Sequence, residues 1–329
     1  MTVLVTGGAG YIGSLMVKRL RAAGQRVVVL DNLSTGRRDN VPSEVEFVQA
    51  DIADSEQVAR VLDKSAATAV LHFAASSQVE ESTSDPMKYY LNNVGGSIGL
   101  LRGMRAAGVE RLVFSSTAAV YGEPQRVPID ETHPKAPINP YGATKLAVER
   151  LLEDLHAAHD LRSVSLRYFN AAGADPEGEL GERRDPPTHL LPLVLQAASG
   201  RRDSVTVFGN DYPTRDGTCV RDYVHVEDLA DAHLRALARL QAGAAELACN
   251  LGTGQGFTVR EVVEAARRVT GHPIPARVVE RRPGDPAALV SGGTRAGELL
   301  GWEPKRAELD DILGDAWRFH SEHPGGYPE

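Results

Sequence analysis

Residues 2–13 read TVLVTGGAGYIG, an apolar run followed by glycines spaced G-x-x-G-x-x-G. The run predicts a buried strand, and the apolar pattern of residues 14–23 predicts a helix directly after it. Glycine is needed where the chain turns tightly and where a side chain would collide with a phosphate, and the helix N-terminus offers free N–H groups. The stretch therefore predicts a dinucleotide-binding turn. We expect these residues to contact the cofactor: Gly7, Gly10, Tyr11, Ile12 and Gly13.

The alternation of strands and helices continues through the first half of the chain. Four more apolar, β-branched runs follow, at residues 26–30, 69–73, 111–115 and 163–167. Apolar strands that alternate with helices indicate an α/β fold with a doubly wound parallel sheet. We therefore expect residues 1–170 to form a Rossmann domain.

The second half of the chain has a different character. Residues 171–187 are rich in Gly, Pro and charged residues, as expected for a loop. We expect residues 171–329 to form mainly a smaller, mixed α/β, substrate-binding lobe that ends in a helix near residues 309–320. Residues 224–240 and 248–251 are the segments expected to return to the first domain.

The composition excludes several classes of partner. The chain has 36 Lys and Arg against 44 Asp and Glu, a net charge of −8, and no basic block, which argues against nucleic acid or an anionic membrane as a partner. No apolar run approaches the ~20 residues of a membrane span, and a strand beginning at Thr2 leaves no room for a signal peptide, so we expect a cytoplasmic protein. Cys219 and Cys249 lack metal-ligand spacing and are interpreted as ordinary buried cysteines; no metal is expected.

Asp31 ends the second predicted strand, roughly 20 residues beyond the glycines. A carboxylate there accepts hydrogen bonds from the adenosine ribose and repels a 2′-phosphate, which favours NAD over NADP. Arg37 and Arg38 follow and are interpreted as solvated surface residues. Asp51 and Ile52 are expected to flank the adenine; the alternative is that Asp51 is a helix N-cap and Ile52 a core residue.

A second glycine cluster, GTGQG at residues 252–256, resembles the first only superficially. The sequence from Thr258 to Glu261 after it has the form of a capping box that opens a helix. We therefore interpret this cluster as a structural turn and not as a second nucleotide site.

Tyr141 and Lys145 are four residues apart, and Asn139 and Pro140 precede them as an N-cap and a first-turn proline precede a helix. Both side chains are then expected on one helix face. Such pairs are frequent by chance on amphipathic helices, but the glycine turn and the Ser-Ser-Thr sequence ending at Thr117 favour a catalytic role.

A tyrosine that acts as a base near neutral pH needs a pKa about three units below its usual ~10, which is roughly 4 kcal/mol of phenolate stabilisation. The ammonium of Lys145 and an oxidised nicotinamide can each contribute positive charge. Lys145 can also hydrogen-bond the nicotinamide ribose, and the Thr117 hydroxyl can bridge the substrate oxygen and Tyr141. We expect these three residues to be catalytic in redox chemistry on a hydroxyl group.

With these residues in view, the chain resembles the extended short-chain dehydrogenase/reductase superfamily, and within it the UDP-glucose 4-epimerases. The resemblance runs nearly end to end. It includes LDNL at 30–33, HFA at 72–74, NNV at 92–94, FSST at 114–117, LRYFN at 166–170, FGNDY at 208–212, VRDYVH at 220–225 and HPGGYP at 323–328.

The resemblance implies an isomerase that interconverts UDP-glucose and UDP-galactose with tightly bound NAD. Tyr141 would take the proton of the sugar 4-hydroxyl while hydride leaves carbon 4 for NAD. The transient 4-keto sugar would then turn and receive the hydride on its other face. Relatives commonly form homodimers, through helices that correspond to residues 86–107 and 141–158 here.

The resemblance also implies binding residues. Further cofactor contacts would be Asn32, Phe73, Ala74, Ala75, Asn92, Ser115, Tyr141, Lys145 and Tyr168. Substrate contacts would be Thr117, Tyr141, Asn170, His189, Leu190, Phe208, Arg221, Tyr223, Arg282, Asp285 and Leu289. Of these, Arg282 also fits on physical grounds, because a guanidinium can bind a diphosphate bidentately.

Several positions depart from the family pattern. Ser77 stands where many members carry a lysine near the cofactor, and Thr117 replaces a more frequent serine. His189 stands where others have an asparagine. Leu289 is intermediate between the tyrosine associated with plain hexoses and the smaller residues that admit N-acetylated sugars.

Three alternative functions differ in how the sequence supports them. A 4,6-dehydratase needs an acid/base pair after Thr117, where this chain has Ala118 and Ala119. A 4-epimerase acting on a UDP-pentose or UDP-N-acetylhexosamine fits the same motifs. A non-catalytic NAD-binding regulator would have no need to retain both Tyr141 and Lys145.

Overall fold

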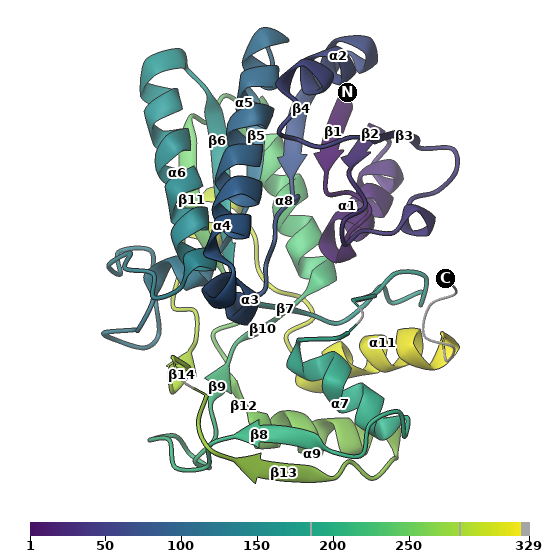
Figure 1. The fold of residues 1–329 in the computed structure, drawn as a ribbon, viewed down its shortest axis with the longest axis vertical. Helices are drawn as coiled ribbons and strands as arrows, with labels where there is room; N and C mark the ends of the chain where they lie inside the picture. Colours follow the sequence, from purple (N-terminus) through teal and green to yellow (C-terminus); the bar gives the residue numbers. More distant parts are fainter. Residues whose placement is uncertain (185, 283, 324–329) are drawn as a thin grey trace.

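A seven-stranded parallel sheet forms the centre of the computed structural model, which describes residues 1–184, 186–282 and 284–323 (Figure 1). The strand order is β11-β6-β5-β4-β1-β2-β3, and every neighbouring pair is parallel. The strands are β1 (Thr2–Thr6), β2 (Arg26–Asp31), β3 (Glu46–Gln49), β4 (Ala67–His72), β5 (Arg111–Thr117), β6 (Arg162–Tyr168) and β11 (Glu246–Leu251). The predicted α/β fold class is confirmed.

Helices cover both faces of this sheet because its strands are apolar on both sides. Val3 and Val5 of β1 lie in the core on one face, and Leu4 between them lies in the core on the other. The first face is covered by α1 (Tyr11–Ala22), α8 (Val226–Gln241) and α10 (Arg295–Leu300). The second is covered by α2 (Ser55–Ser65), α5 (Gly96–Ala106) and α6 (Pro140–His159).

The order of the sheet reverses at β1, which pairs with β2 on one side and β4 on the other. Crossover connections therefore leave β1 and β4 in different directions, which opens a crevice at the carboxyl ends of these strands. Ligands of doubly wound proteins bind in such a crevice, so this edge is where a cofactor is expected.

A smaller lobe lies beyond the carboxyl ends of the strands (Figure 1). It contains three short sheets: β8 (Val205–Phe208) with β13 (Ala276–Val279); β9 (Val220–Arg221) with β12 (Phe257–Thr258) and β14 (Ala288–Leu289); and β7 (Asn170–Ala172) with β10 (Tyr223–His225). Its helices α7 (Leu190–Ala198), α9 (Val259–Thr270) and α11 (Leu309–Glu322) pack around a separate core. The family-like segment at 324–328 lies outside the described residues.

Several local predictions can be compared with this fold. Asn139 caps α6 by accepting the Gly142 N–H at 2.8 Å, with Pro140 in the first turn. Thr258 and Glu261 form the predicted capping box of α9. Cys219 and Cys249 are buried and unbridged. No helix within the described residues is both long and apolar enough to cross a membrane.

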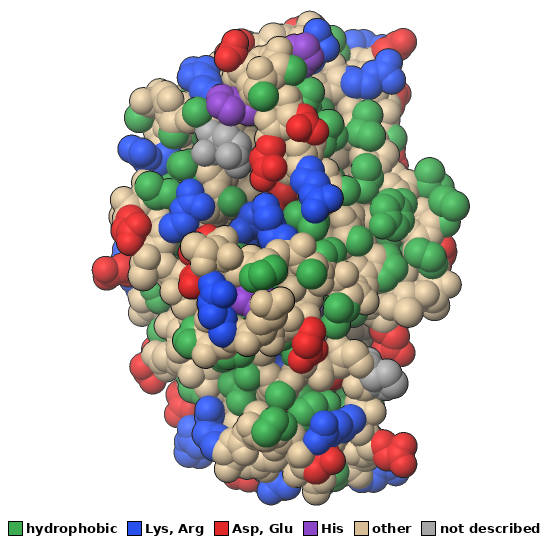
Figure 2. All heavy atoms as spheres, turned by 90° about the vertical axis from the view of Figure 1, so that its left-hand side faces the viewer, with side chains coloured by type: hydrophobic (Ala, Val, Ile, Leu, Met, Phe, Trp, Pro, Cys, Tyr) green, Lys and Arg blue, Asp and Glu red, His purple; other side chains and the backbone are tan. Residues whose placement is uncertain are grey.

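The helix expected at residues 86–107 is interrupted. It consists of α4 (Pro86–Tyr89), a π-helical turn over Tyr90–Gly95, and α5. Large hydrophobic side chains are exposed along it, with Met87 and Leu91 at 67% and 66%. Hydrophobic side chains gather at the right-hand edge of Figure 2, on the side where α4 and α5 face the viewer in Figure 1.

Candidate active site

The glycine turn connects β1 to α1 at the crevice. Gly7 has a φ of +71°, and a Cβ on it would lie 2.5 Å from the backbone nitrogen of Ala74. A Cβ on Gly13 would lie 2.1 Å from the Gly7 carbonyl oxygen. Gly10 is the N-cap of α1 and makes no side-chain cap, so no side chain of the cap residue covers the first N–H groups of the helix. Tyr11 and Ile12 follow in that first turn.

Asp31 lies at the carboxyl end of β2, beside the glycine turn. Its Oδ2 accepts the Ala9 N–H at 3.0 Å and its Oδ1 the Leu33 N–H at 2.8 Å. Burial raises the pKa of this carboxyl, and the two N–H groups oppose that rise. Since a carboxylate oxygen has two lone pairs, each can still accept a ribose hydroxyl.

Asp51 and Ile52 follow β3 at the same edge. Asp51 accepts the Asn32 side-chain amide at 3.0 Å, and its other oxygen accepts the Ala53 N–H at 2.8 Å. The N-cap of α2 is Asp54 and not Asp51. Ile52 is only 6% exposed and packs in the hydrophobic core.

The segment after β4 supplies Phe73, Ala74 and Ala75. The Phe73 N–H donates to the Thr6 carbonyl at 2.9 Å, which extends the β1–β4 pairing into the crevice. The segment is then held by the π-helical turn, where Asn92 donates to the Ser76 hydroxyl at 3.3 Å and Asn93 accepts the Ser76 N–H at 2.8 Å.

Tyr141 and Thr117 meet where α6 begins and β5 ends. A hydrogen bond from the Thr117 hydroxyl reaches the Tyr141 phenol. Thr117 also accepts the Ala119 N–H at 3.1 Å, which fixes the direction of its hydroxyl oxygen. Helix capping at Asn139 sets the start of α6, so local sequence determines where the phenol lies.

Lys145 lies one turn further along α6 and is only 3% exposed. Its Nζ donates to the Ser115 carbonyl at 2.8 Å and lies 4.9 Å from the centre of the Phe114 ring. Burial lowers the pKa of Lys145 to about 7, and Glu149, one turn on, opposes the change. The side chain is thus held close to the point where its ammonium gains or loses a proton near neutral pH.

Burial raises the pKa of the Tyr141 phenol, which is the opposite of what a base needs. Thr117 and the guanidinium of Arg184 oppose that rise. The protein alone therefore does not supply the expected drop in the pKa of Tyr141. Further positive charge must come from the molecule that binds beside the phenol.

Tyr168 ends β6 next to this pair. Its hydroxyl donates to the Ser115 side-chain oxygen, and burial raises its pKa, so Tyr168 stays protonated. His72, at the end of β4, is also neutral, since burial and Lys145 lower its pKa to about 3. The groups on β4 and β5 near Lys145, which are His72, the Ser115 carbonyl and the Phe114 ring, are therefore all neutral.

Several expected substrate residues meet in the smaller lobe. Arg221 of β9 pairs with Asp285 at 3.3 Å, and the Arg282 guanidinium lies 4.2 Å from the centre of the Phe208 ring. Leu289 of β14 is directly opposite Arg221. Leu289 also packs against the cluster that contains Ala118, Tyr121 and Leu146, which links this lobe to α6.

The remaining expected substrate residues are more dispersed. Asn170 donates from its side chain to the Asp222 carbonyl at 3.0 Å. Tyr223 is 5% exposed in the core of the lobe, where burial raises its pKa. His189 contacts Glu182 at 2.7 Å, and Leu190 begins α7 beside it.

A side chain of the protein itself occupies the space at the second glycine cluster. The carboxylate of Asp222, fully buried, accepts the N–H groups of Thr253 at 2.8 Å, Gly254 at 3.0 Å and Ser291 at 3.0 Å. An internal anion thus occupies the position that a phosphate would take in a nucleotide site. The prediction of a structural turn is confirmed.

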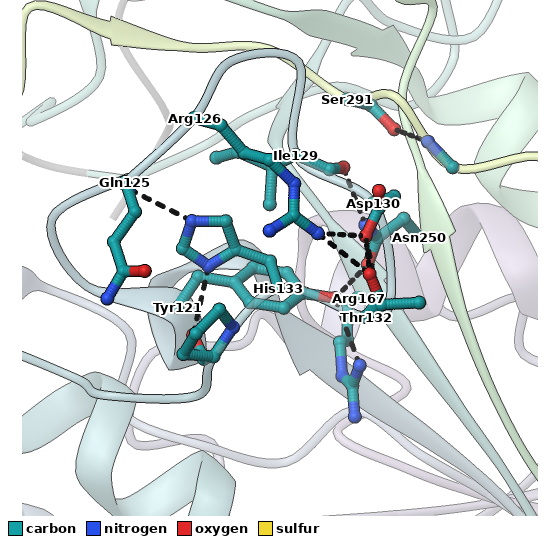
Figure 3. A network of polar contacts seen from close by, with 12 residues as sticks. Tyr121, Gln125, Arg126, Ile129, Asp130, Thr132, His133, Arg167, Asn250 and Ser291 are labelled. Carbon is teal, nitrogen blue, oxygen red and sulfur yellow. Dashed lines mark hydrogen bonds and ion pairs between the residues drawn. The ribbon is translucent and has the colours of Figure 1, made fainter.

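The sequence did not reveal a buried network that adjoins the site. Figure 3 shows the part of it in which Tyr121 contacts Arg167 and Asn250. Arg167 of β6 binds both oxygens of Glu149 at 2.8 and 2.7 Å and donates to the Tyr121 hydroxyl at 3.0 Å. The Tyr121 hydroxyl donates to Asn250 of β11 at 2.6 Å. The spacing of Glu149 from Lys145 was the one available signal, since residues four apart share a helix face.

Comparison with known proteins adds to this geometry. Residues 3–252 match the NAD dependent epimerase/dehydratase family, which is more than half of the chain. The chain belongs to this family. The UDP-glucose 4-epimerase of Streptomyces lividans is 56% identical over 327 residues, covering 99% of this chain and 98% of that protein.

Solved structures of family members agree in fold. A UDP-glucose 4-epimerase from Brucella ovis in complex with NAD superposes with a TM-score of 0.94 at 49% identity, covering 97% of this chain and 98% of that one. One from Bifidobacterium longum in complex with NAD⁺ and UDP gives 0.94 at 37% identity, covering 99% and 100%.

The residues at the crevice fit NAD, the cofactor of the family. Side chains at Gly7 and Gly13 would clash with backbone atoms, which leaves a close-packed glycine surface at the helix N-terminus for a pyrophosphate. Asp31 retains acceptor capacity for a ribose. The glycine turn and Asp31 therefore fit the pyrophosphate and the adenosine ribose of a dinucleotide.

Proposed function

We propose that this chain is a UDP-glucose 4-epimerase, which interconverts UDP-glucose and UDP-galactose by inverting carbon 4. The observation that carries the proposal is that Thr117, at the carboxyl end of β5, meets Tyr141 in the first turn of α6, with Lys145 one turn further along that helix. These groups can move a proton on a hydroxyl that lies next to a nicotinamide.

In the proposed reaction, the Tyr141 phenolate takes the proton of the sugar 4-hydroxyl. Bound NAD supplies reversible hydride acceptance at carbon 4 and, when oxidised, a positive charge. The Thr117 hydroxyl would orient the substrate oxygen toward the phenol, and Lys145, whose Nζ donates to the Ser115 carbonyl, would hydrogen-bond the nicotinamide ribose. Tyr141 then returns the proton to the C4 oxygen after the 4-keto sugar has turned.

The turn of the sugar requires that the uridine diphosphate stays fixed. We assign this role to Arg221 and Arg282, because the chain is acidic overall and an anionic ligand needs local guanidinium groups. Arg221 is already oriented by Asp285, and Arg282 by the Phe208 ring. Residues 171–329, apart from α8, β11 and α10, would then form the substrate lobe.

Elimination of water from the sugar is not supported. Thr117 is followed by Ala118, which is 6% exposed and packs in an apolar cluster with Leu146 and Leu289. No side chain at this point can act as the second acid that a dehydratase needs. The same apolar cluster is consistent with a sugar ring that turns in the site, because it would not hold the ring by polar contacts.

The test is to incubate the purified protein with UDP-galactose, with no NAD added, and to quantify UDP-glucose by chromatography. We expect conversion by the wild-type protein and none by Tyr141→Phe. A parallel sample with UDP-N-acetylgalactosamine reports whether Leu289 admits the larger sugar. Absence of UDP-glucose in the wild-type sample would contradict the proposal.

We also propose that the enzyme is a homodimer in the cytoplasm. The exposed hydrophobic side chains at Met87, Tyr90, Leu91 and Ile98 support a subunit contact along residues 86–107, which would pack with 141–158. Two buried thiols without a disulfide suit a reducing compartment. Equilibrium sedimentation that shows a monomer at micromolar concentration would contradict the dimer.

A further inference from the structure

The segment from Gly173 to Arg184, which we call the crossing segment, follows β7 and runs below α1 in the view of Figure 1. Its first residues are attached to α1. The Tyr11 hydroxyl donates to the Gly173 carbonyl at 2.6 Å, and the Lys18 ammonium binds Asp175 at 2.7 Å. The crossing segment is therefore held against the helix whose N-terminus carries the glycine turn.

Two walls border the cofactor crevice beside the glycine turn. On the β2 side, the loop that contains Asp39 lies on the turn, because the Asn40 side chain donates to the Ala9 carbonyl at 2.8 Å. On the β4 side, the residues after the strand lie against the turn, since a Cβ on Gly7 would come within 2.5 Å of the Ala74 nitrogen. The glycine turn thus forms the base of the crevice between these walls.

Arg183 and Arg184, although adjacent in the sequence, contact opposite walls. The Arg183 guanidinium donates to Asp39 at 3.0 Å, and the Arg184 guanidinium donates at 3.0 Å to the hydroxyl of Ser77, which follows β4. Adjacent Cα atoms are only about 3.8 Å apart, so the main chain of these two residues must pass between the walls. The Arg183 guanidinium also lies 5.6 Å from the centre of the Phe319 ring, and its side chain is 13% exposed.

A dinucleotide at the base of the crevice would lie beneath this crossing. In doubly wound folds the pyrophosphate lies at the N-terminus of the first helix, and the adenosine ribose lies at the carboxylate that ends the second strand. That carboxylate is Asp31 here, and it is hydrogen-bonded to the Ala9 N–H of the glycine turn. Dissociation of a dinucleotide past the crossing segment would therefore require that the contacts of Arg183 or Arg184 break.

We propose that Arg183 and Arg184 hold the crossing segment closed over bound NAD, and that its opening limits the rate at which NAD dissociates. Opening of such a segment is a common rate-limiting step in ligand release. The inference requires NAD, the cofactor of the family, and does not require epimerisation. It gives these two arginines a role in retaining a cofactor that is regenerated in every turnover.

The experiment measures the release of NAD from the holoenzyme. The protein is isolated with its bound NAD and diluted into an excess of radiolabelled NAD, and the uptake of label is followed with time. The variants are Arg183→Gln, Arg184→Gln and Asp39→Asn. The matched control is Arg202→Gln, which changes an exposed arginine of the smaller lobe that donates to the Ser204 carbonyl. Thermal unfolding of each holoenzyme checks that the variant is folded.

We expect exchange to be roughly fivefold faster in Arg183→Gln and in Arg184→Gln, because each loses a hydrogen bond that a charged group donates. Asp39→Asn should accelerate exchange by a similar factor. The double variant Asp39→Asn with Arg183→Gln should be no faster than Arg183→Gln alone, since the same ion pair is already broken. Arg202→Gln should exchange at the wild-type rate.

Asp39→Asn separates this role from a direct contact between an arginine and the cofactor. NAD carries negative charge on its pyrophosphate, so loss of a nearby carboxylate would slow its release if charge attraction alone retained it. The ion pair with Arg183 predicts the opposite sign. The Asp39 side chain is 52% exposed, so its replacement by the isosteric amide removes no core packing.

Exchange in Asp39→Asn that is as slow as in the wild-type protein, or slower, would overturn the proposal. Equal exchange rates for Arg183→Gln and Arg202→Gln would also overturn it, and so would a wild-type protein that loses its NAD during gel filtration. The exchange is measured without any sugar. A wild-type protein that epimerised no UDP-sugar would contradict the proposed function, while the exchange rates would still decide whether the crossing segment retains NAD.

Discussion

Lys145 and Arg167 are buried cations on neighbouring elements, and each is 3% exposed. They differ in how far other groups of the protein pair their charges. Arg167 has a carboxylate on two of its nitrogens and a phenol on a third. Lys145 has a backbone carbonyl and an aromatic ring. The difference is that one charge is fully paired by the protein, whereas the other is left for a ligand to complete.

Glu149 shows this difference clearly, because its carboxylate could form an ion pair with either cation. It is one turn from Lys145 on α6, but its oxygens bind Arg167 and the Ser116 hydroxyl. The distant carboxylate only partly opposes the fall in the pKa of Lys145 to about 7. A buried charge without a partner in contact is costly, so it marks a functional group better than burial alone.

The largest expected effect concerns the phenol beside Lys145. Tyr141→Phe removes the proton acceptor and should lower kcat by about 10³-fold or more, because a positioned acid or base contributes roughly 10² to 10⁴. The fold and NAD binding should be retained, since the ring is unchanged. Steady-state kinetics with UDP-galactose measure the effect, and near-normal turnover would remove Tyr141 from its assigned role.

The next prediction concerns Arg167, the paired cation, and its removal from the ion pair with Glu149. Arg167→Met leaves the buried Glu149 without a charged partner and should reduce the free energy of unfolding by about 3 to 5 kcal/mol. Denaturant unfolding measures the loss. The double variant Arg167→Met with Glu149→Leu is the control, since it removes both charges and should recover much of the stability; a loss in the single variant below 1 kcal/mol would show that the pair is not stabilising the fold.

The opposite change is expected at the unpaired cation. Lys145→Met should abolish most turnover but stabilise the NAD-free protein by about 1 to 3 kcal/mol at neutral pH. The pKa of Lys145 is about 7 in the folded protein and has a usual value of 10.5, so the unfolded chain binds more protons between these values. Wild-type stability should therefore rise with pH through that window.

The direction of this pH dependence is tested by measuring the free energy of unfolding of the wild-type protein and of Lys145→Met as a function of pH. The difference in unfolding free energy between Lys145→Met and the wild-type protein should be greatest below pH 7 and should shrink as the pH rises toward 10.5. A difference in unfolding free energy that is constant with pH would mean that burial of the Lys145 ammonium does not destabilise the folded protein. A decrease in stability in the variant would mean that its hydrogen bond to Ser115 outweighs the charge.

The smallest effect concerns the hydroxyl next to the phenol. Thr117→Val keeps the shape of the side chain but removes its hydrogen bond to Tyr141, which should cost about 1.5 kcal/mol and lower kcat about tenfold. Thr117→Ser is the matched control and should retain activity. Equal rates for Val and Ser would show that the hydroxyl does not guide the proton.

Local sequence patterns predicted the parts of the fold that nearby residues determine. The glycine turn, the cap of α6 at Asn139 and the capping box at Thr258 each depend on residues within one helical turn. The parallel sheet followed from apolar runs of strand length, including the return of residues 248–251 to the sheet in β11.

The sequence could not show which distant side chains would meet. The contact between Arg184 and Ser77 and the one between Tyr121 and Asn250 join segments more than a hundred residues apart. Such contacts depend on how loops close over the sheet, and no periodicity or motif encodes them. The roles of the binding residues remain predictions, including those of His189 and Tyr223.

The most direct test of the account uses UDP-galactose with deuterium at carbon 4 and the purified protein with no NAD added. We predict UDP-glucose that retains the deuterium at carbon 4, because the hydrogen leaves and returns within one site while Tyr141 moves only the hydroxyl proton. UDP-glucose with solvent hydrogen at carbon 4, or no UDP-glucose at all, would contradict it.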